Sequence, residues 1–240
     1  SAGKWLNEAG EKLIQIKNGG NLPIICGGTG LYIKVLQEGI SPIPNIPDNY
    51  IKKANAFLSK VGGTKAIEQI RKADPSFALR LHPNDKQRIV RTLSVMRATG
   101  KSLTDWQKLD QQQKIRDINY FIIHLIPQRE TLYKTIEIRF QEMLKAGAMD
   151  EVKMLMPLEL NPLLPALKAV GVPELTQVLK GKIALADASL NAQRASRNLA
   201  KRQLTWLRNQ VVPAIKVPDF ANKETIIFIK KKVRSYLQGF

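Results

Sequence analysis

The chain has 240 residues, which is enough for one large domain or two smaller ones, and 44% of them are hydrophobic. No apolar run approaches the roughly 18 residues of a membrane-spanning helix, so we expect a soluble globular protein. The 38 Lys and Arg residues outnumber the 20 Asp and Glu residues, for a net charge of +18. This excess favours a polyanionic partner, nucleic acid before a membrane surface.

The chain carries a single cysteine, Cys26, so a disulfide framework is excluded and a reducing compartment is expected. We interpret Cys26 as a small buried hydrophobic residue. The first residues do not form a signal peptide. They have the apolar spacing of an amphipathic helix that ends at Asn18-Gly19-Gly20.

The next stretch joins a predicted strand to a glycine-rich turn. Residues 22–26 form a short apolar run, typical of a strand buried on both faces, and Gly27-Gly28-Thr29-Gly30 follows it. Open α/β sheets hold ligands at such strand-turn-helix junctions, because glycine lets the backbone approach a ligand closely. A tight turn without a ligand is the alternative, since the full phosphate-loop pattern Gly-x4-Gly-Lys-Ser/Thr is absent.

Three prolines in residues 41–47 predict an extended connector, and residues 49–115 are predicted to be helical with short breaks. Asn84 or Asp85 is expected to cap the helix that carries Gln87 to Arg91. Apolar residues of this helix recur at helical spacing, while Arg88 and Arg91 lie three apart on a neighbouring face.

Residues 119–127 predict a second buried strand, in which we interpret His124 as a core residue with its hydrogen bonds satisfied. A long helix follows and ends before Gly147. Residues 215–218 predict a last short strand.

A helix predicted from about residue 185 to 208 places a stripe of basic residues along one side. The stripe contains Arg194, Arg197, Lys201, Thr205 and Arg208. Ala192, Ala195, Leu199 and Trp206 fall on the opposite side. A solvated charged face is one explanation, but the stripe has no acidic residue, which favours contact with an RNA backbone.

Several separated patches together resemble one family, the tRNA dimethylallyltransferases, and they occur in the family's order from residue 1 to about 208. The patches are residues 23–32, 39–44, 82–91, 99–102, 106–107, 139–152, 168–171 and 200–208, of which His82-Pro-Asn-Asp-Lys-Gln-Arg-Ile-Val-Arg91 and Ala200-Lys-Arg-Gln-Leu-Thr-Trp-Leu-Arg208 are the most characteristic.

The resemblance implies an α/β fold with a P-loop-NTPase-like parallel sheet core, a mostly helical insertion and C-terminal helices. The implied division is 1–44 as part of the core, 45–117 as the helical insertion, and 118–240 as the rest of the core with tRNA-binding helices. The family transfers a dimethylallyl group from dimethylallyl diphosphate to N6 of the adenosine at tRNA position 37. The tRNA anticodon arm and dimethylallyl diphosphate are thus the implied partners, Mg²⁺ the implied cofactor, and a cytoplasmic monomer the implied form.

The resemblance also assigns roles to residues. Thr29 is expected in the reaction channel, Arg88 is expected to neutralise the leaving diphosphate, and Lys34 is a further candidate for the diphosphate. Gly27 and Gly28 are expected to line the substrate site. The residues expected to contact tRNA are Gln87, Arg88, Ile89, Val90, Arg91, Lys168, Ala169, Val170, Gly171, Val172, Pro173, Arg194, Arg197, Lys201, Arg202, Gln203, Leu204, Thr205, Trp206, Leu207 and Arg208.

The sequence departs from the family at its start, where family members carry a strand, a phosphate loop and an aspartate that acts as the base. We therefore expect the 240 residues to be a fragment, or a sequence from which the amino-terminal part of the protein is omitted. Alone they are expected to be poorly stable and inactive, since neighbouring strands would have open edges. A non-catalytic RNA-binding fragment is the alternative function. A small-molecule P-loop kinase is disfavoured by the basic excess and the missing phosphate loop.

Overall fold

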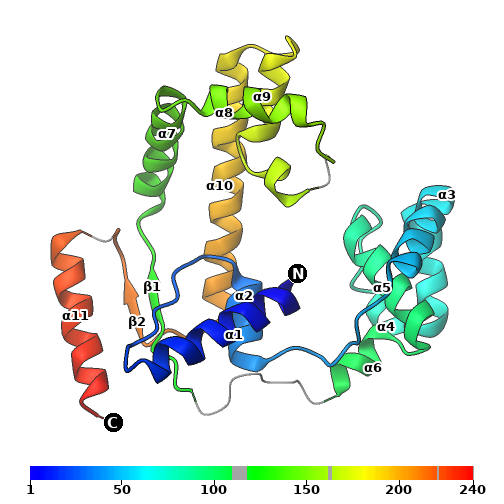
Figure 1. The fold of residues 1–240 in the computed structure, drawn as a ribbon, viewed down its shortest axis with the longest axis horizontal. Helices are drawn as coiled ribbons and strands as arrows, with labels where there is room; N and C mark the ends of the chain where they lie inside the picture. Colours follow the sequence, from blue (N-terminus) through cyan, green and yellow to red (C-terminus); the bar gives the residue numbers. More distant parts are fainter. Residues whose placement is uncertain (110–117, 162–163, 221, 240) are drawn as a thin grey trace. The chain divides into compact units, whose positions relative to one another are not determined.

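The computed structural model describes residues 1–109, 118–161, 164–220 and 222–239 (Figure 1). The chain forms two compact units, one of residues 1–25 and 31–118, the other of residues 26–30 and 119–240. The division into 1–44, 45–117 and 118–240 stays a prediction.

The first unit begins with the predicted amphipathic helix, α1 (Ala2–Asn18), followed by α2 (Gly30–Glu38). The Ser1 hydroxyl caps α1 by accepting a hydrogen bond from the Lys4 amide, and α1 ends at Gly19. The Trp5 ring stacks on Tyr32 of α2, with ring centroids 4.4 Å apart. The prediction of this helix and of its glycine end is confirmed.

The predicted strand at residues 22–26 is wrong. No helix or strand is assigned between Asn18 and Gly30, and Leu22, Ile24 and Ile25 are 52%, 77% and 45% exposed. Cys26 is exposed too, which corrects its interpretation as buried. A buried strand needs hydrogen-bonded neighbours, and the only two strands among the described residues pair with each other.

Four helices form the rest of the first unit: α3 (Asp48–Ala73), α4 (Pro75–Ala78), α5 (Lys86–Thr99) and α6 (Leu103–Lys108). Helices α3 and α5 lie side by side (Figure 1). Their shared core consists of the side chains of Ala54, Leu58, Ala66, Ile67, Ile70, Ala78, Ile89 and Leu93. This confirms the helical prediction for the described part of residues 49–115.

The carboxylate of Asp74 joins α4 to α6 in this unit. It accepts hydrogen bonds from the Phe77 amide at 3.0 Å and from the Thr104 amide and hydroxyl at 3.0 and 2.8 Å. Burial by itself would raise the pKa of Asp74, but these bonds and one from the Ser76 hydroxyl outweigh burial and lower it. Asp74 is therefore a buried structural anion.

The second unit is built on a two-stranded parallel sheet, with Ile123 opposite Ile215 and Leu125 opposite Val217. The prediction of a strand at residues 119–127 holds for three of those residues, and the predicted last strand is confirmed. Among the described residues this is the whole sheet, so the architecture is mostly helical α/β. The elements of this unit are β1 (Ile123–Leu125), α7 (Arg129–Lys145), α8 (Ala148–Leu155), η1 (Met156–Leu158), η2 (Pro165–Lys168), α9 (Val172–Leu179), α10 (Leu185–Gln210), β2 (Ile215–Val217) and α11 (Lys223–Leu237).

Helix α10 runs beside α7 and α9 and supplies one wall of the second unit's core (Figure 1). The core contains Phe140, Val152, Leu175 and Ala192. The predicted helix 185–208 is thus confirmed, two residues longer at its end. In the part of the chain that the structure describes, no helix has the length and apolar character needed to cross a bilayer.

His124 of β1 is 4% exposed, as expected for a core residue, yet neither ring nitrogen has a hydrogen-bond partner among the described residues. The interpretation of His124 as a satisfied residue is therefore wrong. Burial, and next the Lys216 ammonium on β2, lower the pKa of His124. The imidazole is held in its neutral form.

This burial predicts a pH-dependent stability. Below the unfolded-state pKa of His124, about 6.5, the unfolded chain binds a proton that the folded chain does not. Above that pH, neutral His124 contributes fully to the free energy of unfolding. As the pH is lowered, the free energy of unfolding falls by at most about 1.4 kcal/mol per pH unit. Denaturant unfolding between pH 7.5 and 5 measures this slope.

Replacing His124 by Leu removes the titrating group, so the slope becomes shallower. His82→Leu, at an exposed position, is the comparison variant for the loss of one histidine. A slope that persists unchanged in His124→Leu contradicts the assignment.

Asp74→Ala is expected to destabilise the first unit by about 3 kcal/mol, because the Phe77 and Thr104 amides lose a charged acceptor. Glu68→Ala, at an exposed position of α3, is the control and is expected to change stability by less than about 0.5 kcal/mol. Thermal unfolding compares the two variants. Equal stability of Asp74→Ala and the wild type would show that the hydrogen bonds contribute nothing.

Candidate functional site

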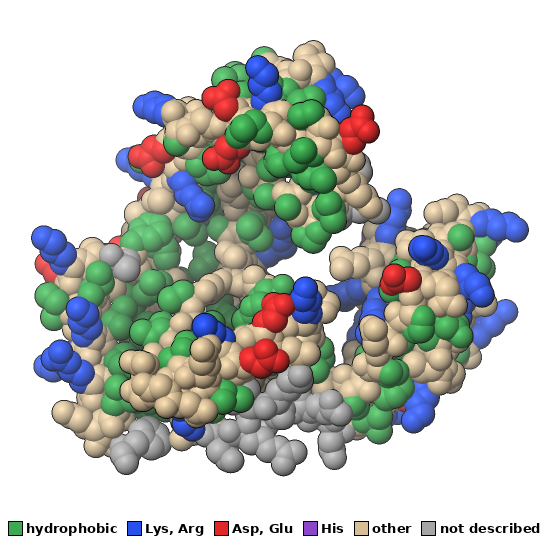
Figure 2. Space-filling model, in the orientation of Figure 1, with side chains coloured by type: hydrophobic (Ala, Val, Ile, Leu, Met, Phe, Trp, Pro, Cys, Tyr) green, Lys and Arg blue, Asp and Glu red, His purple; other side chains and the backbone are tan. Residues whose placement is uncertain are grey.

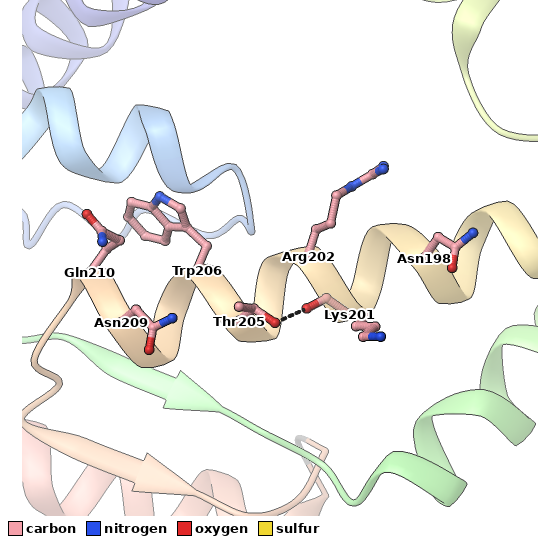
Figure 3. Close-up of a pocket in the computed structure, with 7 residues that line it drawn as sticks. All are labelled: Asn198, Lys201, Arg202, Thr205, Trp206, Asn209 and Gln210. Atoms are coloured by element: carbon pink, nitrogen blue, oxygen red, sulfur yellow. Dashed lines mark hydrogen bonds between the residues drawn. The ribbon is translucent and has the colours of Figure 1, made fainter. Parts of the chain in front are cut away.

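Helix α10 presents a polar, basic face to solvent. Asn198, Lys201, Arg202, Thr205 and Asn209 are exposed, and the Thr205 hydroxyl donates a hydrogen bond to the Lys201 carbonyl at 2.8 Å. Figure 3 shows Arg202, Trp206 and Gln210 projecting from one side of the helix. A surface hollow of about 600 Å³ runs along this face, lined by Asn198, Lys201, Arg202, Thr205, Trp206, Asn209 and Gln210.

The glycine turn packs against α10 through two glycines. A Cβ atom at residue 28 would lie 2.6 Å from Nε2 of Gln203, and a Cβ atom at residue 30 would overlap the benzene ring of the Trp206 indole. Gly27, by contrast, has no neighbouring atom within 4 Å of a Cβ position. Close packing on the helix therefore accounts for Gly28 and Gly30, whereas Gly27 borders open space.

Thr29 lies between these two contacts and is exposed. The residues on either side of it contact side chains of α10. A hydroxyl both donates and accepts hydrogen bonds, which suits a base edge or a phosphate oxygen. The turn and the basic helix thus form one local assembly.

Arg197 does not belong to the free basic stripe that the sequence predicts. Its guanidinium pairs with Glu137 of α7 at 3.1 Å and lies 5.9 Å from the centroid of the Tyr133 ring. The stripe itself has no acidic residue, but α7 supplies one to Arg197. Arg194, Lys201 and Arg208 are exposed, so they remain available to an anion. Leu199, expected on the apolar side, is 42% exposed.

The predicted residues 87–91 lie in the first half of α5, in the first unit. Asp85 caps this helix by accepting a hydrogen bond from the Arg88 amide at 3.1 Å. Gln87, Arg88 and Arg91 are exposed, whereas Ile89 is fully buried in the core between α3 and α5. The side chain of Ile89 therefore has no access to a ligand, and Val90 packs against the same core.

The Arg88 guanidinium lies 3.5 Å from the Asp85 carboxylate in an exposed pair. Such pairs are weak, so a phosphate can replace Asp85 as the partner of Arg88. In Figure 2 many Lys and Arg side chains cover the visible face of the helices α3 to α6, with few acidic ones among them. This surface is suited to an anionic partner.

The segment 168–173 joins η2 to α9. Lys168, Ala169 and Pro173 are exposed, while Val170 and Val172 pack against the core of the second unit. Gly171 has a φ of +103°, and its amide donates a hydrogen bond to the Glu174 carboxylate at 2.9 Å. Lys168 is therefore the one cation that this short segment offers to a partner. Lys34 on α2 forms an ion pair with Glu38 at 3.6 Å.

Among residues 1–109, 118–161, 164–220 and 222–239, no three His, Cys, Asp or Glu side chains gather closely enough to hold a metal ion. Mg²⁺ therefore stays an expectation from the family resemblance, and none of the described residues is assigned to it.

Two structural roles were missed at the level of sequence. The contact of Gln203 and Trp206 with tRNA stays a prediction, and the structure adds a contact of both side chains with the turn. Gly28 and Gly30 indicated that another group comes close to the backbone of the turn, but the sequence did not indicate which segment supplies that group. Asp74 was also missed, although Asp-Pro at the start of a short helix signals a side-chain cap.

Comparisons with known proteins assign the chain to a family. The family model described as IPP transferase matches residues 1–210. A tRNA dimethylallyltransferase of Rhodospirillum centenum is 41% identical over 214 residues, which are 89% of this chain and 68% of the relative. A tRNA dimethylallyltransferase of Paramagnetospirillum magneticum is 38% identical over 237 residues, 99% of this chain and 75% of the relative.

A solved structure agrees with this assignment. The full-length tRNA isopentenylpyrophosphate transferase of Bacillus halodurans superimposes with a TM-score of 0.64 at 27% identity, over 100% of this chain and 74% of that protein. The family model covers all of α1 to α10, including the glycine turn and the basic face. The chain belongs to the IPP transferase family.

Proposed function

We propose that the protein modifies tRNA by transferring a dimethylallyl group from dimethylallyl diphosphate to N6 of the adenosine beside the anticodon, at position 37. The observation that carries this proposal is the packing of the turn around Thr29 against α10, which also bears the basic face. One helix thus brings a site for RNA phosphates next to a hydroxyl that can reach a base. The sequence identity with tRNA dimethylallyltransferases supports the same reaction.

The chemistry sets what the residues must supply. The adenine N6 attacks C1 of the dimethylallyl group, the C1–O bond breaks, and the diphosphate leaves with the bonding electrons. N6 then gives up a proton to a base. Negative charge grows on the diphosphate as the bond breaks, so a fixed guanidinium lowers the barrier. We assign this role to Arg88, which forms an exposed ion pair with Asp85.

Binding of the RNA is assigned to exposed cations. Arg194, Lys201, Arg202 and Arg208 on α10 neutralise backbone phosphates, and Lys168 extends this contact. The target adenine must leave the stack of the anticodon loop before it can react, and we assign Thr29 to hydrogen-bond it there. Gly27 borders open space beside Thr29, which leaves room for the base or for the diphosphate.

The 240 residues contain no Gly-x4-Gly-Lys-Ser/Thr motif, and no carboxylate among the described residues is assigned as the base. The phosphate loop and the base are proposed to come from additional polypeptide. Residues 1–240 alone are therefore expected to bind tRNA without modifying it.

A prenyl-transfer assay tests this proposal. The 240-residue chain and the protein encoded by the complete gene are each incubated with radiolabelled dimethylallyl diphosphate and tRNA. Label incorporated by the complete protein, and lost when the adenosine at position 37 is changed to guanosine, supports the function. Binding of tRNA without transfer by either protein favours the non-catalytic RNA-binding alternative.

Arg88→Ala in the complete protein is expected to lower kcat on the order of 10²–10³-fold, because a preorganised donor to the leaving group is lost. The Kd for tRNA is expected to change far less. Arg71→Ala, an exposed arginine on α3 of the same unit, is the control for a general loss of positive charge. A weaker tRNA affinity at unchanged kcat would reassign Arg88 to binding.

Arg194 and Arg197 are expected to behave differently, although they lie three residues apart on one helix. Arg194→Ala removes an exposed cation, so the slope of log Kd for tRNA against log salt decreases by about one. Arg197→Ala breaks the pair with Glu137 and leaves that slope nearly unchanged. Filter binding between 50 and 300 mM salt measures both slopes, and equal decreases would contradict the structural role of Arg197.

A further inference from the structure

The two contacts between the turn and α10 flank Thr29 directly. Gln203 touches the position before Thr29, and Trp206 touches the position after it. The two helix residues are three apart, so they lie on adjoining parts of the α10 surface. Thr29 between them is exposed. Contacts with α10 therefore hold the turn at the residue before Thr29 and at the residue after it.

We propose that Trp206 and Gln203 are positioning residues, which hold residues 28–30 against α10 and so fix where the Thr29 hydroxyl points. The inference rests on the proposed function, in which Thr29 acts on the base or the diphosphate. It adds a positioning role for these two side chains to the tRNA contact that the sequence predicts.

The two contacts differ in stiffness. The Gly28 contact is made by the end of a flexible glutamine side chain, which can rotate away from a larger neighbour. The Gly30 contact is made by a fused ring system that has little freedom in a packed site. Trp206 is therefore the main determinant, and alanine at position 28 is better tolerated than alanine at position 30.

This arrangement connects RNA binding with the turn. Arg202 and Thr205 lie within about one helical turn of Trp206 and line the hollow with it (Figure 3). A backbone phosphate bound at Arg202 is then held at a fixed place relative to Thr29, because Trp206 ties both to one rigid helix. Misplacement of a reacting group by about 1 Å can reduce a rate about 10²-fold.

A size-swap experiment tests the contact. Gly30→Ala introduces a methyl group into the indole, and Trp206→Ala removes the indole. The Gly30→Ala/Trp206→Ala double variant is expected to have a higher Tm than Gly30→Ala alone. Its kcat, relative to the wild type, is expected to be at least about tenfold above the product of the relative kcat values of the two single variants. Gly30→Ala combined with Leu207→Ala is the control, because the atoms nearest to a Cβ at residue 30 belong to Trp206 and not to Leu207. Purely additive losses in the double variant would overturn the proposal.

Steady-state kinetics of the complete protein separate positioning from RNA contact. Trp206→Ala is expected to lower kcat about 10²-fold while the salt slope of tRNA binding stays unchanged, and Trp206→Phe is expected to restore most of the rate. A loss confined to tRNA affinity would overturn the positioning role.

The two proposals fail in different ways. If the wild-type protein transfers no dimethylallyl group, the proposed function is refuted, and with it the role of Trp206 in orienting Thr29 for transfer. If the wild type is active and the Tm values of the size-swap set are additive, the positioning proposal alone is refuted.

Discussion

The packing of Gly30 against the indole of Trp206 is the constraint on which the rest of the candidate site depends. Any side chain at residue 30 would overlap the ring, so the turn and α10 meet at backbone distance. Thr29 is held between this contact and the one at Gln203. Because α10 is also anchored in the core through Ala192, the position of the turn follows from the packing of the second unit.

Charged side chains of this protein have two kinds of role, exposure to a partner and stabilisation of the fold. Exposed cations on α5 and α10 supply part of the excess positive charge, and such cations displace counterions from an RNA backbone when they bind it. Arg197 has a structural use, since its ion pair with Glu137 joins α10 to α7. Asp74 shows the opposite case, a buried anion whose carboxylate accepts hydrogen bonds from backbone amides and from hydroxyl groups.

Helices were predictable from the sequence because their signals are local. The periodicity of residues 1–18, the Asp85 cap and the extent of α10 all follow from residues within a few positions of one another. The strand at 22–26 was not predictable in this way, since an apolar run becomes a strand only beside neighbours that it can pair with. The same limit applies to Arg197, whose partner Glu137 is 60 residues away, and to Trp206, whose neighbour is set by tertiary packing.

The central claim is that α10 and the glycine turn together receive the anticodon region of a tRNA. A tRNA that carries a photoreactive adenosine analogue at position 37 tests it most directly, with the cross-linked peptide identified by mass spectrometry. The account predicts cross-links to the peptide that contains Thr29, and further cross-links to α10 when the analogue is placed in the flanking backbone. Cross-links confined to α11, with none to residues 26–30 or to α10, would contradict it.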